Sequence, residues 1–200
     1  MKIRKFYVNN QRYIKKWIYI LLIIFVFGIC AGSVYAALLG IEYDLEINTY
    51  FYEYFNNIKS TDNVANILKN SLISNIKTVA LIFFVAFVKP GILVILATVG
   101  LKGFICGFTA ATFVKHYSVY GMILTSSSLI SDCIYFPTLL YFCARSVSFC
   151  LNREKTEKRK IREFLMLSIC CLTIFCITSC FDAFLTTTFM KLAASKFNIK

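Results

Sequence analysis

The stretch from Lys89 to Lys115, KPGILVILATVGLKGFICGFTAATFVK, decides the fold. Its 23 residues from Ile92 to Val114 are apolar or small except for one lysine, Lys102, at the eleventh position. A helix of about 20 apolar residues crosses the roughly 30 Å hydrocarbon core of a bilayer. The stretch therefore predicts a membrane helix that carries a lysine near mid-membrane.

A lysine at this depth needs a polar or charged neighbour. On insertion scales it costs roughly 2.5–3.5 kcal/mol, and about 15 Å of helix separates Lys102 from either end of the run. Snorkelling does not bring the ammonium group to an interface over that distance. We therefore expect Lys102 to face other helices. Gly103 and Gly107 should let those helices approach closely.

The composition extends this reading to the whole chain. Hydrophobic residues make up 58% of the 200 residues, and the mean hydropathy is +0.69, which is typical of an integral membrane protein. The formal net charge is +12, but the basic residues lie mainly at the ends of hydrophobic runs, where cytoplasmic flanks carry them. We therefore expect the lipid bilayer as a partner and no nucleic acid.

The hydrophobic runs predict an all-α, polytopic bundle of about five transmembrane helices. The N-terminus carries six basic residues and no acid, whereas the first polar segment holds five of the ten acids, so we expect an N-in and C-out orientation. The predicted segments are a basic cytoplasmic N-terminus at 1–17, spans at 18–39, 72–88, 92–114, 119–144 and 164–183 (the middle three within 72–151), an extracytoplasmic segment at 40–71, a basic cytoplasmic loop at 152–163 and an extracytoplasmic tail at 184–200.

The first span has a competing interpretation as a cleaved signal peptide. Val34-Tyr35-Ala36 resembles a small-x-small cleavage site. The hydrophobic core, 22 residues from Ile18 to Leu39, is long for such a peptide. An uncleaved anchor is therefore the preferred interpretation.

Small residues recur every four positions in the first span. Gly28, Gly32, Ala36 and Gly40 follow this spacing, which leaves one face of the helix smooth enough to touch another helix. Chance is the alternative, because glycine and alanine are common in membrane helices. With the pair in the third span, the candidate helix-packing residues, which could also serve self-association, are Gly28, Gly32, Gly103 and Gly107.

The extracytoplasmic segment contains apolar residues at helical spacing, which predicts an amphipathic helix of about three turns. Such a helix lies on the membrane surface, docks into a partner's groove or caps the protein's own spans. The candidate partner-binding residues are Ile47, Phe51, Tyr54, Phe55 and Ile58.

Three charged residues fall inside or at the edge of predicted spans. Asp132 lies at nearly the depth of Lys102 in an antiparallel neighbour, so the two are expected to pair or to share a polar site. The alternative is that each bonds separately to backbone or hydroxyl groups, such as those at 125–128. Asp182 lies near the outer face. Intramembrane charges of this kind also fit a small transporter or channel subunit, although we find no inverted repeat.

Residues for enzyme chemistry are sparse. Most of the nine cysteines lie inside predicted spans, where cysteine acts as a small hydrophobe. No pair has CxxC or zinc-ligand spacing. The one histidine, His116, lies in a predicted turn, and no HExxH, GxSxG or Walker motif is present. We therefore expect no enzymatic activity, cofactor or metal.

Several stretches together resemble the stage II sporulation protein M family. Leu101–Lys115 is similar to its KGxxxGFTxGF stretch, and Pro137 follows a polar segment as in its next helix. Phe181–Phe184 and Met190–Ala193 resemble its acidic-aromatic exit and Met-Lys-Leu close. One departure is Ile130–Asp132, where the family tends to show Pro-Gln-Asn. The resemblance covers most of residues 14–194.

This resemblance implies a non-enzymatic membrane scaffold of endospore-forming bacteria. The family is similar to a protein that holds two peptidoglycan hydrolases, stage II sporulation proteins D and P, at the sporulation septum and the engulfing membrane of the mother cell. Those hydrolases thin the septal wall during forespore engulfment. The implied partners are therefore these two hydrolases, docked on the extracytoplasmic side.

Overall fold

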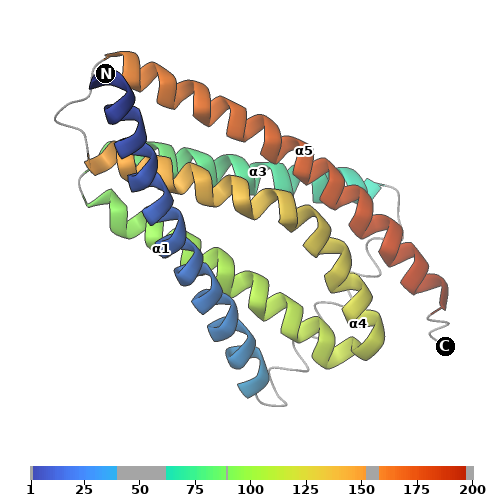
Figure 1. Ribbon diagram of the computed structural model, residues 1–200. Coiled ribbons are helices and arrows are strands. Elements are labelled where there is room, and N and C mark those ends of the chain that lie inside the picture. The colour runs from blue at the N-terminus through green and yellow to red at the C-terminus, as the bar shows by residue number, and fades with distance from the viewer. Residues whose placement is uncertain (1, 40–61, 89, 152–157, 197–200) are drawn as a thin grey trace.

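The computed structural model describes residues 2–39, 62–88, 90–151 and 158–196. Apart from Leu39 and the turn at 86–88 and 90, this part of the chain is helical, and it has no strand. Figure 1 shows its four helices lying lengthwise against one another in a bundle. Their bounds are α1 at Lys2–Leu38, α3 at Asp62–Val85, α4 at Gly91–Leu151 and α5 at Lys158–Lys196.

Five helical segments are long and apolar enough to cross a membrane, which confirms the predicted all-α membrane bundle. Helix α4 supplies two of them because it reverses direction near its middle while it stays helical (Figure 1). The orientation across the membrane stays a prediction. The segments are Ile14–Leu38, Leu68–Val85, Gly91–Lys115, Leu129–Leu151 and Ile161–Leu185.

Some bounds differ from the sequence-based ones. Among the described residues the fourth apolar segment begins at Leu129, inside the predicted span 119–144, and helix α4 is continuous through both. Helix α5 continues to Lys196, through most of the segment predicted to be an extracytoplasmic tail. The five candidate partner-binding residues between Ile47 and Ile58 lie outside the described residues.

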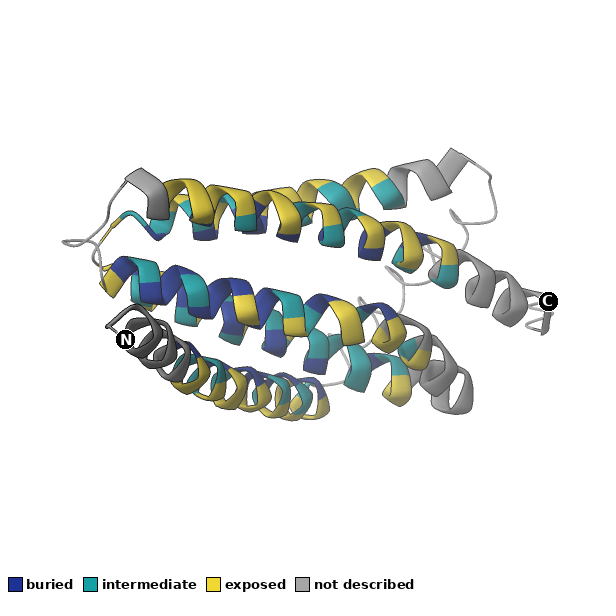
Figure 2. Ribbon diagram, turned by 45° about the horizontal axis from the view of Figure 1, so that its top comes forward, coloured by how far each residue is buried: buried dark blue, intermediate teal, exposed yellow. Residues whose placement is uncertain are grey.

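The bundle has two ends, which we name for the argument that follows. Helix α1 packs mainly on α4, and α5 packs on both α3 and α4. Buried positions line the inner faces of the helices, and exposed positions face outward (Figure 2). The proximal end holds Ile14, Val85, Gly91, Leu151 and Ile161, and the distal end holds Leu38, Leu68, Lys115, Leu129 and Leu185.

The outward faces are apolar. Phe27 and Leu38 are 74% and 78% exposed, and α1 and α5 carry many other exposed aliphatic and aromatic side chains. Hydrocarbon tails are as apolar as leucine, so exposure of this kind suits a lipid surface. The outward faces therefore match the membrane setting that the hydropathy predicts.

The proximal half of the bundle is filled by an aromatic cluster. The Phe164 ring stacks on that of Phe149 with centroids 4.7 Å apart, and on that of Phe83 at 5.5 Å. The Phe142 ring lies parallel to Phe164 at 6.0 Å and is fully buried. Phe87 adds edge contacts to Phe149 and Phe164. This cluster joins α3, α4 and α5 in a solid core.

Helix α1 meets the first half of α4 at a glycine-lined interface. A Cβ atom added at Gly28 would lie 2.5 Å from the carbonyl oxygen of Gly100, and one at Gly32 would overlap that of Phe104. Across the interface, Cβ atoms at Gly103 and Gly107 would overlap backbone of α1. The faces that the sequence offered for self-association are thus covered within one chain.

Candidate functional site

A polar cavity of about 410 Å³ lies between the helices in the distal half of the bundle. Residues of α3, of both halves of α4 and of α5 line it. It contains all three of the charged residues that the sequence placed in or near the membrane, namely Lys102, Asp132 and Asp182. The structure therefore gathers these residues from three separate passes of the chain.

Lys102 reaches the cavity from the middle of the segment Gly91–Lys115. Its ammonium nitrogen lies 5.7 Å from the centroid of the Tyr135 ring, a cation–π distance. Its charge also attracts that of Asp132. Among the described residues no direct ion pair joins the two, so they share a polar site and do not form a closed salt bridge.

The carboxylates come from two different helices. Asp132 lies in the second half of α4, and Asp182 lies in α5 near the distal end of the apolar segment Ile161–Leu185. Both line the cavity, and their negative charges are close enough to repel each other. The three charged side chains therefore give the lining both signs, with one more negative charge than positive.

Two hydroxyl groups on α4 face the same cavity. Ser131 and Tyr135 are only 5% and 8% exposed, and within the described part of the chain neither side-chain oxygen has a hydrogen-bond partner. They are four residues apart, on one face of the helix. Buried polar groups are nearly always hydrogen-bonded, so this pair needs an explanation.

A hydrogen bond between α3 and α5 forms one wall of the cavity. The Asn75 side-chain amide donates to the Ser179 hydroxyl at 2.7 Å, and Ser179 donates to the Phe175 carbonyl at 2.8 Å. Thr178 lines the cavity next to Ser179. Polar groups of four helical passes thus surround the same space.

The cavity reaches the distal end but not the proximal one. Ser71 and Phe113, close to the distal ends of the apolar segments Leu68–Val85 and Gly91–Lys115, line it at one side. On the proximal side of Tyr135, Leu139 and Ile95 are fully buried, followed by the aromatic cluster. The bundle is therefore hollow and polar in one half and solid in the other.

The sequence pattern found the three charges but not the whole lining. Tyr135, Ser179 and Thr178 were not singled out, although Tyr135 follows Asp132 by three residues and so lies near it on one helix face. That spacing was the available signal. For Thr178 and Ser179 the sequence held no such signal, because only the packing of α5 on α4 brings these two residues to the cavity.

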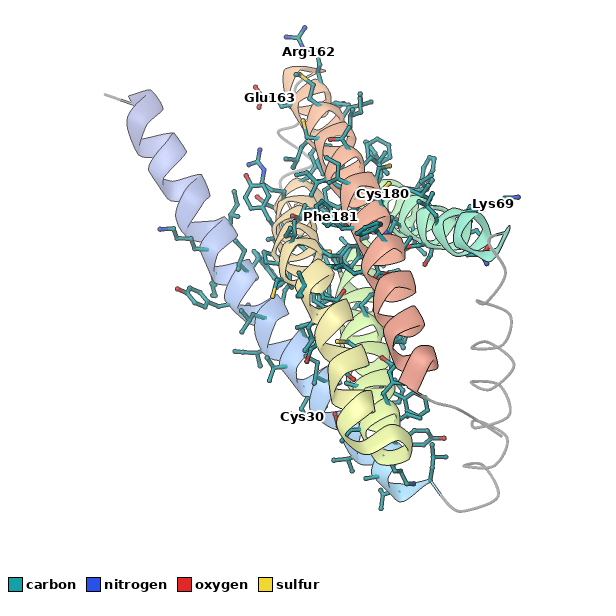
Figure 3. All side chains as sticks on the ribbon, turned by 90° about the vertical axis from the view of Figure 1, so that its right-hand side faces the viewer. Cys30, Lys69, Arg162, Glu163, Cys180 and Phe181 are labelled. Atoms are coloured by element: carbon teal, nitrogen blue, oxygen red, sulfur yellow. The ribbon has the colours of Figure 1, made fainter. Side chains whose placement is uncertain are left out.

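Charged residues also mark the proximal end. Figure 3 shows Arg162 and Glu163 projecting from the first turns of α5 there, and Lys69 on α3 at the distal side. Both α5 residues are exposed. In the described part of the chain, no three histidine, cysteine, aspartate or glutamate residues gather as metal ligands. The polar cavity is therefore the candidate site considered below.

The fold and the cavity define a class: a multi-pass helical membrane protein with a polar site among its spans. The sequence model of the family described as stage II sporulation protein M matches residues 21–187. The chain belongs to this family, which confirms the resemblance seen in the sequence. Searches of curated proteins and of solved structures gave no match.

Proposed function

We propose that this protein is a non-enzymatic membrane scaffold that anchors peptidoglycan hydrolases during sporulation. Family membership makes it a sporulation-related multi-pass membrane protein. The match over residues 21–187 carries the proposal, because it includes nearly all of the five apolar segments. In this proposal the partners are stage II sporulation proteins D and P, at the septum and the engulfing membrane of the mother cell.

The packing of the bundle supports an anchoring role. The aromatic cluster and the glycine interface tie every described helix into one body. A rigid body in the membrane can hold a partner without losing conformational entropy of its own on binding. The hydrolases would dock on the extracytoplasmic side, through the predicted amphipathic helix between Ile47 and Ile58.

A capture experiment tests the proposal. The protein carries a tag at its N-terminus, cells are crosslinked at the start of spore formation, and the membranes are solubilised in mild detergent. We expect the hydrolases to be recovered with the full chain. Recovery should fall strongly when Phe51, Tyr54 and Phe55 are all changed to Ser, because the apolar face that fills the partner's groove is lost.

A matched control uses the polar face of the same segment. The triple variant Glu53→Ser, Asn56→Ser and Asn57→Ser changes as many residues and should capture the hydrolases normally. Equal capture by both triple variants would refute docking through the apolar face. Recovery of only further copies of this chain, or of transport ATPases, would refute the scaffold itself.

The polar cavity favours a second candidate function, a small transporter or channel subunit. Intramembrane charges often line transport paths, and Lys102 and Asp132 lie in such a position. Transport would require the solid proximal half to open. The purified protein in liposomes should then show solute or ion flux, and Lys102→Met should abolish that flux. If no solute or ion tested crosses the liposome membrane, the transporter function is refuted and the scaffold function remains.

A further inference from the structure

The polar cavity has no task in hydrolase anchoring, yet it has the properties of a small-molecule site. Its volume of about 410 Å³ falls within the roughly 300–1,000 Å³ of ligand pockets. Sites of this type commonly lie between the helices of a bundle and hold a few convergent polar groups. The questions are whether it takes an occupant, and of which chemical class.

The two unpartnered hydroxyls indicate a polar occupant. Ser131 and Tyr135 are both more than nine-tenths buried, and both line the cavity without a hydrogen-bond partner among the described residues. A serine in a helix can satisfy its hydroxyl with a carbonyl one turn earlier, as Thr138 does on the same helix at 2.9 Å. Ser131 does not use this option, so its oxygen is available to the cavity.

The charges select the class of occupant. A simple cation entering the cavity would be attracted by the two carboxylates but repelled by Lys102, and a simple anion would be attracted by Lys102 but repelled by Asp132 and Asp182. A neutral molecule would leave the charges of both signs without new partners. A molecule with an ammonium group and an anionic group can place the first near the carboxylates and the second near Lys102, with charge-assisted hydrogen bonds at both ends.

We propose that the polar cavity is a binding site for a small zwitterion, such as an amino acid or the ethanolamine phosphate headgroup of a lipid. Lys102 binds the anionic group, Asp132 and Asp182 receive the ammonium group, and Ser131 and Tyr135 complete the hydrogen bonds. The ligand enters from the distal end, because the proximal half is filled by the aromatic cluster. The proposal requires neither hydrolase anchoring nor transport.

Titration calorimetry on the purified full chain in detergent tests this assignment. The probes are glycine and glycerophosphoethanolamine, with methylamine, sodium and acetate as ligands of one charge. We expect one zwitterion to bind at least about tenfold more tightly than any singly charged probe, because both ends form bonds to charged groups. If glycine binds more tightly, the natural ligand is a soluble amino acid. If glycerophosphoethanolamine binds more tightly, the natural ligand is a lipid headgroup.

Several results would overturn the proposal. Methylamine or sodium binding as tightly as the zwitterions would make the cavity a cation site. No heat of binding for any probe up to about 10 mM, roughly tenfold weaker than a millimolar site, would mean that the cavity holds water only. Unchanged zwitterion binding in Lys102→Met or Asp132→Asn would place the ligand elsewhere.

Two near-isosteric variants keep the test valid if the charge variants fail to fold. Ser131→Ala and Tyr135→Phe each remove one cavity oxygen. Both should weaken zwitterion binding, whereas the thermal stability of the ligand-free protein should not fall, because an unpaired buried hydroxyl is removed. Thr138→Val, on the same helix but outside the cavity lining, should bind normally. A loss of ligand-free stability with unchanged binding would assign the hydroxyls a structural role and overturn the proposal.

The result of the zwitterion-binding test can be distinguished from the result of the hydrolase-capture test. Ser131→Ala and Tyr135→Phe leave the extracytoplasmic segment between Ile47 and Ile58 intact. The same two variants should therefore capture hydrolases like the unmodified protein. Loss of zwitterion binding with normal capture supports both proposals, whereas normal zwitterion binding in these variants overturns only the cavity assignment.

Discussion

A single methyl group at Gly28 should separate α1 from α4, whereas the same change at Gly100 should not. A Cβ atom at Gly28 would lie 2.5 Å from a backbone oxygen, but one at Gly100 would lie 3.5 Å from the end of the Ile24 side chain, an ordinary contact. Both glycines are in the same interface. The pair therefore separates steric clash from the general effect of adding alanine to a helix.

The expected magnitude follows from this geometry. Ordinary contact begins at 3.4 Å, so Gly28→Ala must push the two backbones apart by about 0.9 Å. A gap of roughly 0.5–1 Å forfeits about a quarter to a half of the dispersion energy of the atoms on either side, and overpacking typically costs about 1–3 kcal/mol. Gly100→Ala should instead be neutral or stabilise the helix by up to about 1 kcal/mol.

The assay is thermal unfolding in detergent, monitored with a thiol-reactive dye after the exposed cysteines have been blocked. Cys143, Cys150 and Cys171 are buried and report the loss of packing. We expect Gly28→Ala to melt several degrees below Gly100→Ala. Equal melting temperatures for the two variants would refute the argument that backbone contact at this interface requires glycine.

Three further predictions concern other parts of the bundle. Phe142→Ala should lower the free energy of unfolding by about 3–5 kcal/mol because the ring is fully buried, whereas Phe27→Ala on the lipid face should change it little in the same dye assay. Asn75→Ala removes an interhelical hydrogen bond and should cost about 0.6 kcal/mol, the average for membrane bundles; a cost above roughly 2 kcal/mol would contradict this. In a variant without other exposed cysteines, an impermeant thiol reagent should label Lys69→Cys in intact cells but Glu163→Cys only in opened membranes, and the reverse pattern would refute the N-in orientation.

The sequence alone predicts the features that depend on local pattern. Hydropathy identifies five spans, and the mid-run position of Lys102 predicts that it faces other helices, because lipid offers it no partner. The four-residue spacing of Gly28 and Gly32 marks a face for close approach, and the structure fills that face with α4. These predictions succeed because each needs only one helix.

The features that the sequence does not reveal depend on which helices are neighbours. Tyr135 and Ser179 meet in one cavity only because α3, α4 and α5 pack as they do. Similar depth predicted that Lys102 and Asp132 either pair or share a polar site, but depth alone does not decide between these two arrangements. In the structure both side chains line the same cavity, which is the second of these arrangements.

The glycine interface between α1 and α4 has a consequence for biogenesis. Ser33 on α1 donates a hydrogen bond to the carbonyl of Gly107, 74 residues further along the chain. At about 5–20 residues per second, the ribosome needs roughly 4–15 s to make that stretch. During this interval α1 is already synthesised but the first half of α4 is not. The glycine-lined face of α1 must therefore contact lipid or the insertion machinery. The time for which this face of α1 stays uncovered therefore depends on how fast the ribosome reaches Gly107.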